Sequence, residues 1–358
     1  MADAPRHEIS SGQLVGFLIS AQLGLGILGL PRYAVEGAGH TGWWLVLCTG
    51  VVSFAGVALI LALCGRFRAS VIAINPKVLG KIPGTIVNLL VFVLLLASTP
   101  VKLAMYLQTM KIFFFRETPA WVLTAFLVAP TLYQVAKGLK VIARFDSFVY
   151  LAVLFLLAMM ATNATKAEWT FLLPLTHFET KAFAVTIPGL AFGFLGYELL
   201  LIVYPWVKGN PGRAAFLAEG VTTLVLTSFT IFAIAFFGEA FLPKQVFPLL
   251  GLVRTWQAPV VERLDIYFLM FWLPAMGAAF TAFLIATQLV AVELFPRLSY
   301  RLVIILLGVV VSGSALFLRD FDATESAVRA IAAVEFFGLG LALPGLLYTI
   351  ACLRRLKE

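Results

Sequence analysis

Two glycine-rich apolar stretches decide the fold, Gln22-Leu23-Gly24-Leu25-Gly26-Ile27-Leu28-Gly29-Leu30-Pro31 and Pro188-Gly189-Leu190-Ala191-Phe192-Gly193-Phe194-Leu195-Gly196-Tyr197-Glu198. Each lies in a segment otherwise apolar enough to cross a bilayer. Glycine inside a helix costs roughly 1 kcal/mol relative to Ala, and unwound backbone is tolerated in hydrocarbon only where it lines a protein-enclosed cavity. A pair of such interruptions in corresponding halves is typical of transporters that bind their substrate near the bilayer midplane.

The composition around these stretches is that of a polytopic membrane protein. Hydrophobic residues make up 61% of the 358 residues, charged residues 12%, and the mean hydropathy is +1.00. A soluble domain is nearer half apolar and a quarter charged. Cys48, Cys64 and Cys352 form no CxxC or Cys/His pattern, so we predict no metal, cofactor or disulfide framework. The short polar start of the chain has no cleavage site, so we expect no cleaved signal peptide.

Apolar segments of about 20 residues span a bilayer, and ten are predicted in this chain. They cover about 10–31, 42–65, 84–110, 120–136, 141–162, 182–206, 215–238, 264–292, 300–318 and 326–352. The linkers are brief, and the longest, 239–263, could hold a short surface helix. The glycine interruptions fall in the first and sixth segments.

Basic residues predict the orientation of these spans. Fifteen of the 26 Lys and Arg lie in segments on the side of the N-terminus, ten lie on the other side, and Lys102 lies within a span. Cytoplasmic loops carry the excess of Lys and Arg, so both termini are predicted in the cytoplasm. The net charge of +8 follows from this topology, and no basic run with interleaved aromatics indicates nucleic-acid binding.

Ten spans divide into two halves of five, about 10–162 and 182–352, within a single transmembrane domain 1–358. Halves with an odd number of spans must cross the membrane in opposite senses. We therefore predict an all-α integral membrane protein of ten transmembrane helices with a 5+5 inverted repeat, the architecture of many secondary transporters, in which helices 1 and 6 are broken.

The same residues resemble a known family. Gly24-Leu25-Gly26-Ile27-Leu28 with Leu30-Pro31, Phe192-Gly193 with Gly196-Tyr197-Glu198, Tyr204-Pro205, and Val261-Glu262-Arg263-Leu264-Asp265 are similar to the spore germination permease family, within the amino acid–polyamine–organocation superfamily. Its members are the B subunits of nutrient germinant receptors. The likeness covers essentially the whole chain, and Leu264 stands where the family usually has Ile.

This resemblance implies the amino-acid permease (LeuT-like) fold, and a receptor rather than an enzyme. It implies a small-nutrient ligand, an amino acid, together with germinant-receptor subunits of the A and C types as partners and the inner spore membrane as location. A proton-coupled amino-acid permease is an alternative function. A second alternative is a receptor-complex scaffold or permeation path that binds no ligand.

The two interruptions are the predicted ligand site. Free backbone groups at a broken helix suit both the carboxylate and the ammonium of an amino acid. The predicted binding residues are Gly24, Leu25, Gly26, Ile27, Phe192, Gly193, Phe194, Gly196, Tyr197 and Glu198. The alternative is that these glycines only permit close helix packing.

Glu198, Lys102 and Glu335 lie inside predicted spans, where an uncompensated charge is costly. Glu198 either contacts the ligand or carries a proton, or else caps the unwound turn by accepting backbone N–H groups. Lys102 and Glu335 are possible charge partners in the third and tenth spans. Glu262, Arg263 and Asp265, before the eighth span, are predicted to form an external gate or helix cap. Sodium coupling is not supported, since Thr281 is the only hydroxyl near the middle of the eighth span, with Thr287 lower.

Overall fold

The protein is described by a computed structural model, which covers residues 7–147, 149–175, 186–255 and 264–356. Helices occupy each of the ten predicted ranges, with ends within a few residues of those expected except at α1. The long ones are α1 (Ser11–Ala38), α2 (Gly42–Phe67), α4 (Lys81–Phe113), α5 (Ala120–Lys137), α7 (Val149–Asn163), α10 (Pro211–Phe237), α12 (Leu264–Leu294) and α13 (Tyr300–Phe317). The shorter ones include α3 (Val71–Leu79), α6 (Leu139–Asp146), α9 (Leu200–Val203), α11 (Pro248–Thr255), α14 (Phe321–Ala333) and α15 (Leu343–Leu353).

Side-chain caps define where several of these helices begin. Ser10 forms a capping box with Gln13 at the start of α1, in which each side chain bonds the backbone N–H of the other. Asn210 accepts a hydrogen bond from the Arg213 N–H at 3.0 Å at the start of α10, where Pro211 occupies the first turn. Such caps satisfy backbone donors that have no partner within the helix.

The predicted break in the first span is wrong. The helix α1 runs unbroken from Ser11 to Ala38, through the glycines and through Pro31. The glycines serve close packing instead. A Cβ on Gly24 would lie 2.5 Å from the Ala279 Cβ on α12, and a Cβ on Gly26 would collide with the Gly193 backbone. Contacts this close offset the poor helix propensity of glycine.

The predicted break in the sixth span is present. The helical segments Thr186–Gly193 and Tyr197–Trp206 meet at an angle of 64°. Gly196 lies in the bend at φ +132°, a conformation that a residue with a Cβ rarely adopts. The stretch is made of short 3₁₀ pieces, η4 (Ala191–Gly193), η5 (Tyr197–Leu199) and η6 (Tyr204–Trp206), around α9.

Two further irregularities were not predicted. The fifth span is divided, since α6 ends at Asp146 and α7 begins at Val149. The tenth span continues from α14 through a π-helical stretch, η8 (Val334–Ala342), into α15. π-helical turns are often found at functional sites.

The predicted surface helix of the 239–263 linker exists as α11, but it is not on the surface. Leu249, Leu252 and Val253 are buried, and α11 packs against α1 and α12. Its apolar side chains therefore belong to the core, which explains why the linker carries them.

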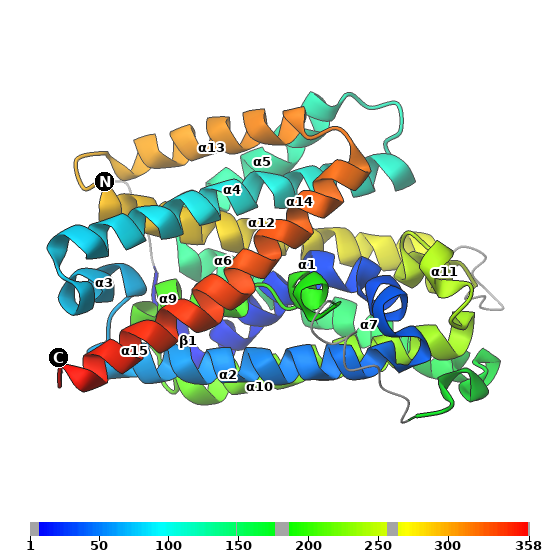
Figure 1. Ribbon diagram of the computed structural model, residues 1–358. Helices are drawn as coiled ribbons and strands as arrows, with labels where there is room; N and C mark the ends of the chain where they lie inside the picture. Colours follow the sequence, from blue (N-terminus) through cyan, green and yellow to red (C-terminus); the bar gives the residue numbers. More distant parts are fainter. Residues whose placement is uncertain (1–6, 148, 176–185, 256–263, 357–358) are drawn as a thin grey trace.

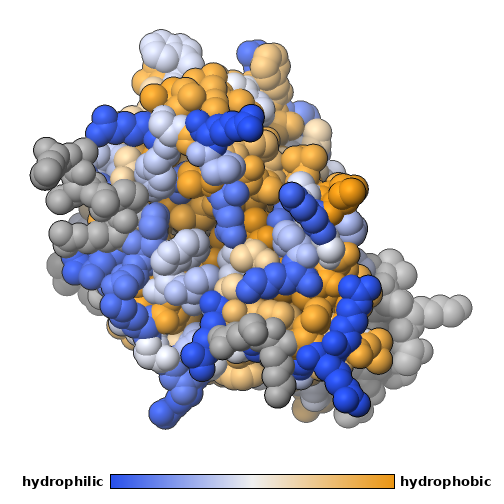
Figure 2. Space-filling view, turned by 90° about the vertical axis from the view of Figure 1, so that its left-hand side faces the viewer, coloured by the Kyte–Doolittle hydropathy of each residue, from blue (hydrophilic) through white to orange (hydrophobic). Residues whose placement is uncertain are grey.

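The helices form one bundle, and β1 and α15 lie toward the same end of it (Figure 1). The two-residue strands β1 (Ile9–Ser10) and β2 (Val207–Lys208) pair in parallel, so the segment before α1 is tied to the end of the broken span. Arg66 at the end of α2 donates to the Leu356 carbonyl at 2.6 Å, which brings the C-terminus to this end too. Figure 2 looks onto it and shows many hydrophilic side chains among apolar ones.

The lengths and hydropathies of the helices are those of a multi-pass membrane protein. Among the described residues, six helical stretches are long and apolar enough to cross a membrane, and the bent pair Thr186–Gly193 and Tyr197–Trp206 makes a seventh. Leu90, Phe126 and Val309 are among the large apolar side chains exposed on the outside of the bundle. Exposed apolar surface of this kind suits contact with lipid.

Candidate functional site

Glu198 lies in the bend of the broken span. Its side chain is fully buried, and its Oε2 accepts a hydrogen bond from the Gly196 backbone N–H at 2.8 Å. The capping role considered for this residue is therefore present. Its Oε1, however, has no hydrogen-bond partner among the described residues. One oxygen holds the bend, and the other is available.

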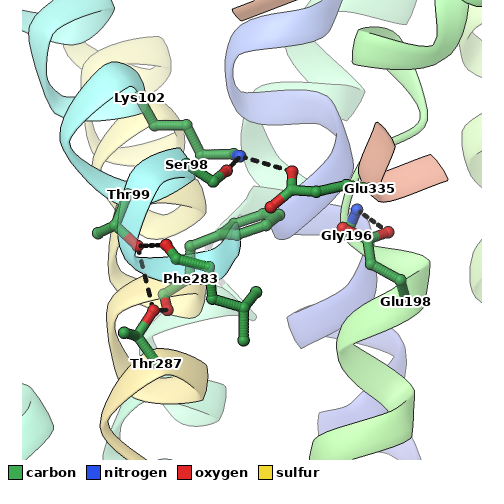
Figure 3. Close-up of polar contacts among 9 residues, drawn as sticks. Ser98, Thr99, Lys102, Gly196, Glu198, Phe283, Thr287 and Glu335 are labelled. Atoms are coloured by element: carbon green, nitrogen blue, oxygen red, sulfur yellow. Dashed lines mark hydrogen bonds and ion pairs between the residues drawn. The ribbon is translucent and has the colours of Figure 1, made fainter. Parts of the chain in front are cut away.

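Lys102 and Glu335 form a buried ion pair opposite Glu198 (Figure 3). The Lys102 Nζ lies 3.3 Å from the Glu335 Oε2 and also donates to the Ser98 hydroxyl, one helical turn earlier on α4. The same ammonium lies 3.6 Å from the centre of the Phe283 ring on α12, a cation–π contact. Lys102 is 6% exposed and Glu335 is not exposed. The predicted partnership of these two residues is thus seen in the structure.

The three charges belong to one electrostatic cluster. Both Glu335 and Lys102 act electrostatically on Glu198, and Figure 3 shows the Glu335 carboxylate between Lys102 and Glu198. The Glu335 Oε1, like the Glu198 Oε1, lacks a hydrogen-bond partner among the described residues. Two buried carboxylates therefore lie near one ammonium, which is bonded to Glu335. If all three groups are charged, the cluster carries an excess negative charge that an added cation or proton would balance.

Tyr197 connects the broken span to the π-helical stretch. Its hydroxyl donates to the Phe336 carbonyl at 2.9 Å, and the two rings meet edge to face with centroids 5.3 Å apart. A Cβ on Gly340 would overlap the Tyr197 ring. Tyr197 therefore acts through packing and one hydrogen bond, and this contact joins Glu198 and Glu335 through their neighbours.

The remaining predicted binding residues are divided. Gly24 and Gly26 lie on α1 against α12 and Gly193, while Ile27 and Phe194 are fully buried. Leu25 lies in α1, but its side chain is outside the described part of the structure, as is that of Asp265 in the first turn of α12. Glu262 and Arg263 of the predicted gate lie outside the described residues.

Phe192 belongs to a second group of side chains, near the C-terminal end of α1. Its ring meets Tyr33 edge to face at 5.5 Å between centroids, and the Arg329 guanidinium lies 4.5 Å from the centre of the Tyr33 ring. A cavity of about 20 Å³ lies beside them, with room for about one water molecule. It is lined by Leu28, Gly29, Tyr33, Met105, Phe192, Phe247, Glu325, Val328 and Arg329.

Two buried carboxylates were missed by the sequence analysis, Glu219 and Asp146. Glu219 on α10 accepts from the Gln22 amide at 3.2 Å and bonds Ser53 on α2, so it ties three helices together. Asp146 ends α6 and is fully buried. Both satisfy the criterion that identified Glu198, because each is an ionisable residue inside a predicted span.

Comparisons with known proteins show which sequence family the chain is similar to. The family described as "Spore germination protein" matches residues 8–318. The chain is 26% identical to spore germination protein GerQB of Bacillus cereus over 74% of each chain, and 22% identical to spore germination protein B2 of Bacillus subtilis over 74% of each.

Among solved structures, that of MhsT in complex with L-phenylalanine superposes with a TM-score of 0.65 and 16% identity, over 98% of this chain and 97% of MhsT. At this identity the likeness establishes the fold alone, and it confirms the predicted all-α, LeuT-like membrane architecture. The match over residues 8–318 places the chain in a sequence family, and it belongs to the spore germination protein family.

Proposed function

We propose that this chain is the ligand-recognising membrane subunit of a spore germinant receptor and that it binds an amino acid between α1, the broken span and η8. Membership of the spore germination protein family supports the receptor role. The LeuT-like fold supports a site at the broken span.

The charge of the cluster is the observation that carries the proposal. The Glu198 Oε1 and Glu335 Oε1 are both buried and without a hydrogen-bond partner among the described residues, and Lys102 is the cation that acts on both carboxylates. An ammonium group supplies up to three donors and one positive charge. The α-ammonium of an amino acid would therefore satisfy both oxygens and balance the charge.

The bend supplies groups for the other end of the ligand. Short helical pieces end and begin on both sides of Phe194–Gly196. Helix ends carry unpaired backbone groups and partial charges, positive at an N-terminus. The ligand carboxylate would bind there, and the ligand side chain would extend toward Phe192 and Ile27.

Access to the site needs a rearrangement. A cavity of about 20 Å³ is much smaller than an amino acid. The Tyr33 and Phe192 rings line this cavity and contact each other, and separation of the two rings would enlarge it. Ligand capture would then change the angle between the halves of the broken span, and the A- and C-type subunits would read that change in the inner spore membrane.

A thermal-shift screen of the purified protein against the twenty amino acids tests the proposal. A ligand at 100 times its Kd adds roughly 2.7 kcal/mol of stability. We expect one or a few amino acids to raise the melting temperature. If none does, and the protein still co-purifies with other receptor subunits, the scaffold alternative replaces the proposal.

A flux measurement separates sensing from transport. Proteoliposomes containing the protein are loaded with buffer and exposed to the labelled amino acid found in the screen. A receptor is expected to bind without concentrative uptake. Uptake driven by an imposed pH gradient would instead establish the proton-coupled permease alternative.

A further inference from the structure

A buried carboxylate lies at the interruption of the fifth span, far along the chain from the residues of the ligand site. Asp146 is the last residue of α6 and is fully buried. Neither of its carboxylate oxygens has a hydrogen-bond partner among the described residues. Figure 1 shows α6 inside the bundle, beside α1 and α12. Asp146 takes no part in the ion pair or in the bend around Glu198.

The first half of α1 covers Asp146. A Cβ on Gly16 would lie 3.6 Å from the Asp146 carbonyl carbon, an ordinary van der Waals contact, so α1 packs directly against the end of α6 here. Ser20 follows one turn later, is fully buried, and is close enough to interact with the Asp146 side chain. Its hydroxyl donates to the Gly16 carbonyl at 2.9 Å. Ser20 is therefore a polar neighbour of Asp146 on α1, and a hydroxyl oxygen can accept a hydrogen bond from a protonated carboxyl.

Among the described residues, the elements packed against α6 place no neutralising charge beside Asp146. They are α1, α5, α12 and β1. No titratable residue occurs in α1 between Ser11 and Leu30. The titratable groups of α5, α6 and α12 whose side chains are described are engaged elsewhere or turned outward: Lys137, Lys140 and Arg144 are exposed or half-exposed, Tyr133 and Tyr267 are exposed, and Glu293 bonds Ser70. Just before β1, His7 accepts from the Leu139 N–H and Glu8 pairs with Lys208.

We propose that Asp146 is a proton-binding site that holds its proton while α1 and α6 are packed together and exchanges it when they separate. An ionised carboxylate without a partner is disfavoured in a dry interior. The packed state therefore needs the neutral acid, whereas a hydrated, separated state favours the carboxylate. The proposal does not depend on the identity of any ligand.

Infrared spectroscopy of the ligand-free protein in lipid tests the charge state. A protonated carboxyl has a C=O stretch separate from that of a carboxylate. We expect the wild-type minus Asp146→Asn difference spectrum at neutral pH to contain this band, with its shift in D₂O. Glu293→Gln, which removes an exposed carboxylate, is the matched control and should leave the band in place. A difference spectrum for Asp146→Asn without the protonated-carboxyl band would overturn the proposal.

Cysteine accessibility tests the link to helix packing. With Cys48, Cys64 and Cys352 replaced by Ala, Ala143→Cys places a thiol on the buried face of α6. Its labelling rate, corrected for the thiolate fraction, should rise several-fold with pH when Asp146 is present and stay flat in Asp146→Asn. Equal pH dependence in both backgrounds would contradict the proposal. If the Asn variant does not fold, Asp146→Ser provides the same comparison.

A sodium arm distinguishes the proton from a metal cation. Both measurements are repeated at fixed pH with sodium chloride replaced by choline chloride. A proton site predicts no difference between the two salts. Loss of the protonated-carboxyl band on adding sodium would reassign Asp146 to sodium binding.

Discussion

Glu198 uses its two carboxylate oxygens differently. The Oε2 accepts the Gly196 N–H at 2.8 Å and so holds the bend, while the Oε1 has no hydrogen-bond partner among the described residues. The structural and functional interpretations of this residue are therefore compatible, since each concerns a different atom. Lys102 and Glu335 complete the cluster from α4 and η8.

Replacement of Glu198 separates the two roles. Glu198→Gln keeps an oxygen acceptor for the Gly196 N–H, so we expect nearly wild-type thermal stability with a weakened ligand response. Glu198→Leu removes the acceptor and leaves a buried N–H unpaired, at a cost of ~1–3 kcal/mol. Melting temperatures of the two purified variants check this. A Leu variant as stable as the Gln variant would show that the hydrogen bond does not hold the bend.

The Lys102–Glu335 pair should be costly to break from one side. Lys102→Met leaves Glu335 buried beside Glu198 without its cation, and removing one partner of a buried pair costs about 3–5 kcal/mol. The double variant Lys102→Met, Glu335→Gln removes both charges and should recover much of this loss. Denaturant unfolding of the wild type, both single variants and the double variant gives the coupling energy. Additive effects would contradict a direct pair.

The sequence predicts the members of this cluster better than their contacts. Glu198, Lys102 and Glu335 are recognisable because ionisable residues inside spans are costly and need partners. The same rule applies to Glu219 and Asp146, which were not singled out. The Phe283 contact with Lys102 could not be predicted, because it depends on how α4 and α12 pack across 181 residues of chain.

The helices show why glycine alone does not break a span. In α1 the glycines face close neighbours, and the helix continues through them, whereas in the sixth span Gly196 adopts φ +132° and the chain bends by 64°. The two stretches have similar composition but different packing partners. Local sequence does not reveal this difference, and it likewise gave no signal of the interruption after Asp146 or of the π-helical turn around Glu335.

Paired substitutions in α1 test the packing role of its glycines. Gly24→Ala would place a Cβ 2.5 Å from the Ala279 Cβ and 2.9 Å from the Ala275 carbonyl oxygen, so we expect overpacking to cost ~1–3 kcal/mol. Gly29→Ala is the matched control, because its Cβ would meet only the Tyr33 ring, at 3.4 Å. Its higher helix propensity should leave stability unchanged or raise it by up to ~1 kcal/mol. A Gly24→Ala variant that melts at the same temperature as Gly29→Ala, or above it, would contradict the packing described for α1.

In the whole molecule, the described ends of the chain lie at one end of the bundle, beside the ends of α2 and the broken span. This agrees with an even number of crossings. The spans were predictable because bilayer thickness fixes the length of a membrane-crossing helix. A run of apolar residues of that length can be read directly from the sequence. The division into two inverted repeats and the cytoplasmic location of the termini stay predictions.

Cysteine labelling of intact membranes tests the orientation. In a cysteine-free background, single cysteines in 66–82 or 208–214 are predicted to face the cytoplasm. They should react with a membrane-impermeant reagent added outside only after the membrane is permeabilised. Cysteines in 163–181 or 319–325 should react from outside. The reason is the distribution of basic residues, fifteen against ten. Opposite labelling of either set would reverse or refute the assignment of the spans.

We propose that Glu198 and Glu335 together bind the ammonium group of the ligand. The most direct test is to remove that ammonium group from the ligand. Binding of the amino acid found by the thermal-shift screen is compared with that of its deaminated analogue, in the wild type, Glu198→Gln, Glu335→Gln and the control Glu293→Gln. In the wild type and the control, deamination should weaken binding at least about 30-fold, equivalent to ~2 kcal/mol. In the two site variants this difference should largely disappear. Equal binding of both compounds by the wild type, or the same 30-fold difference in all four proteins, would contradict the account.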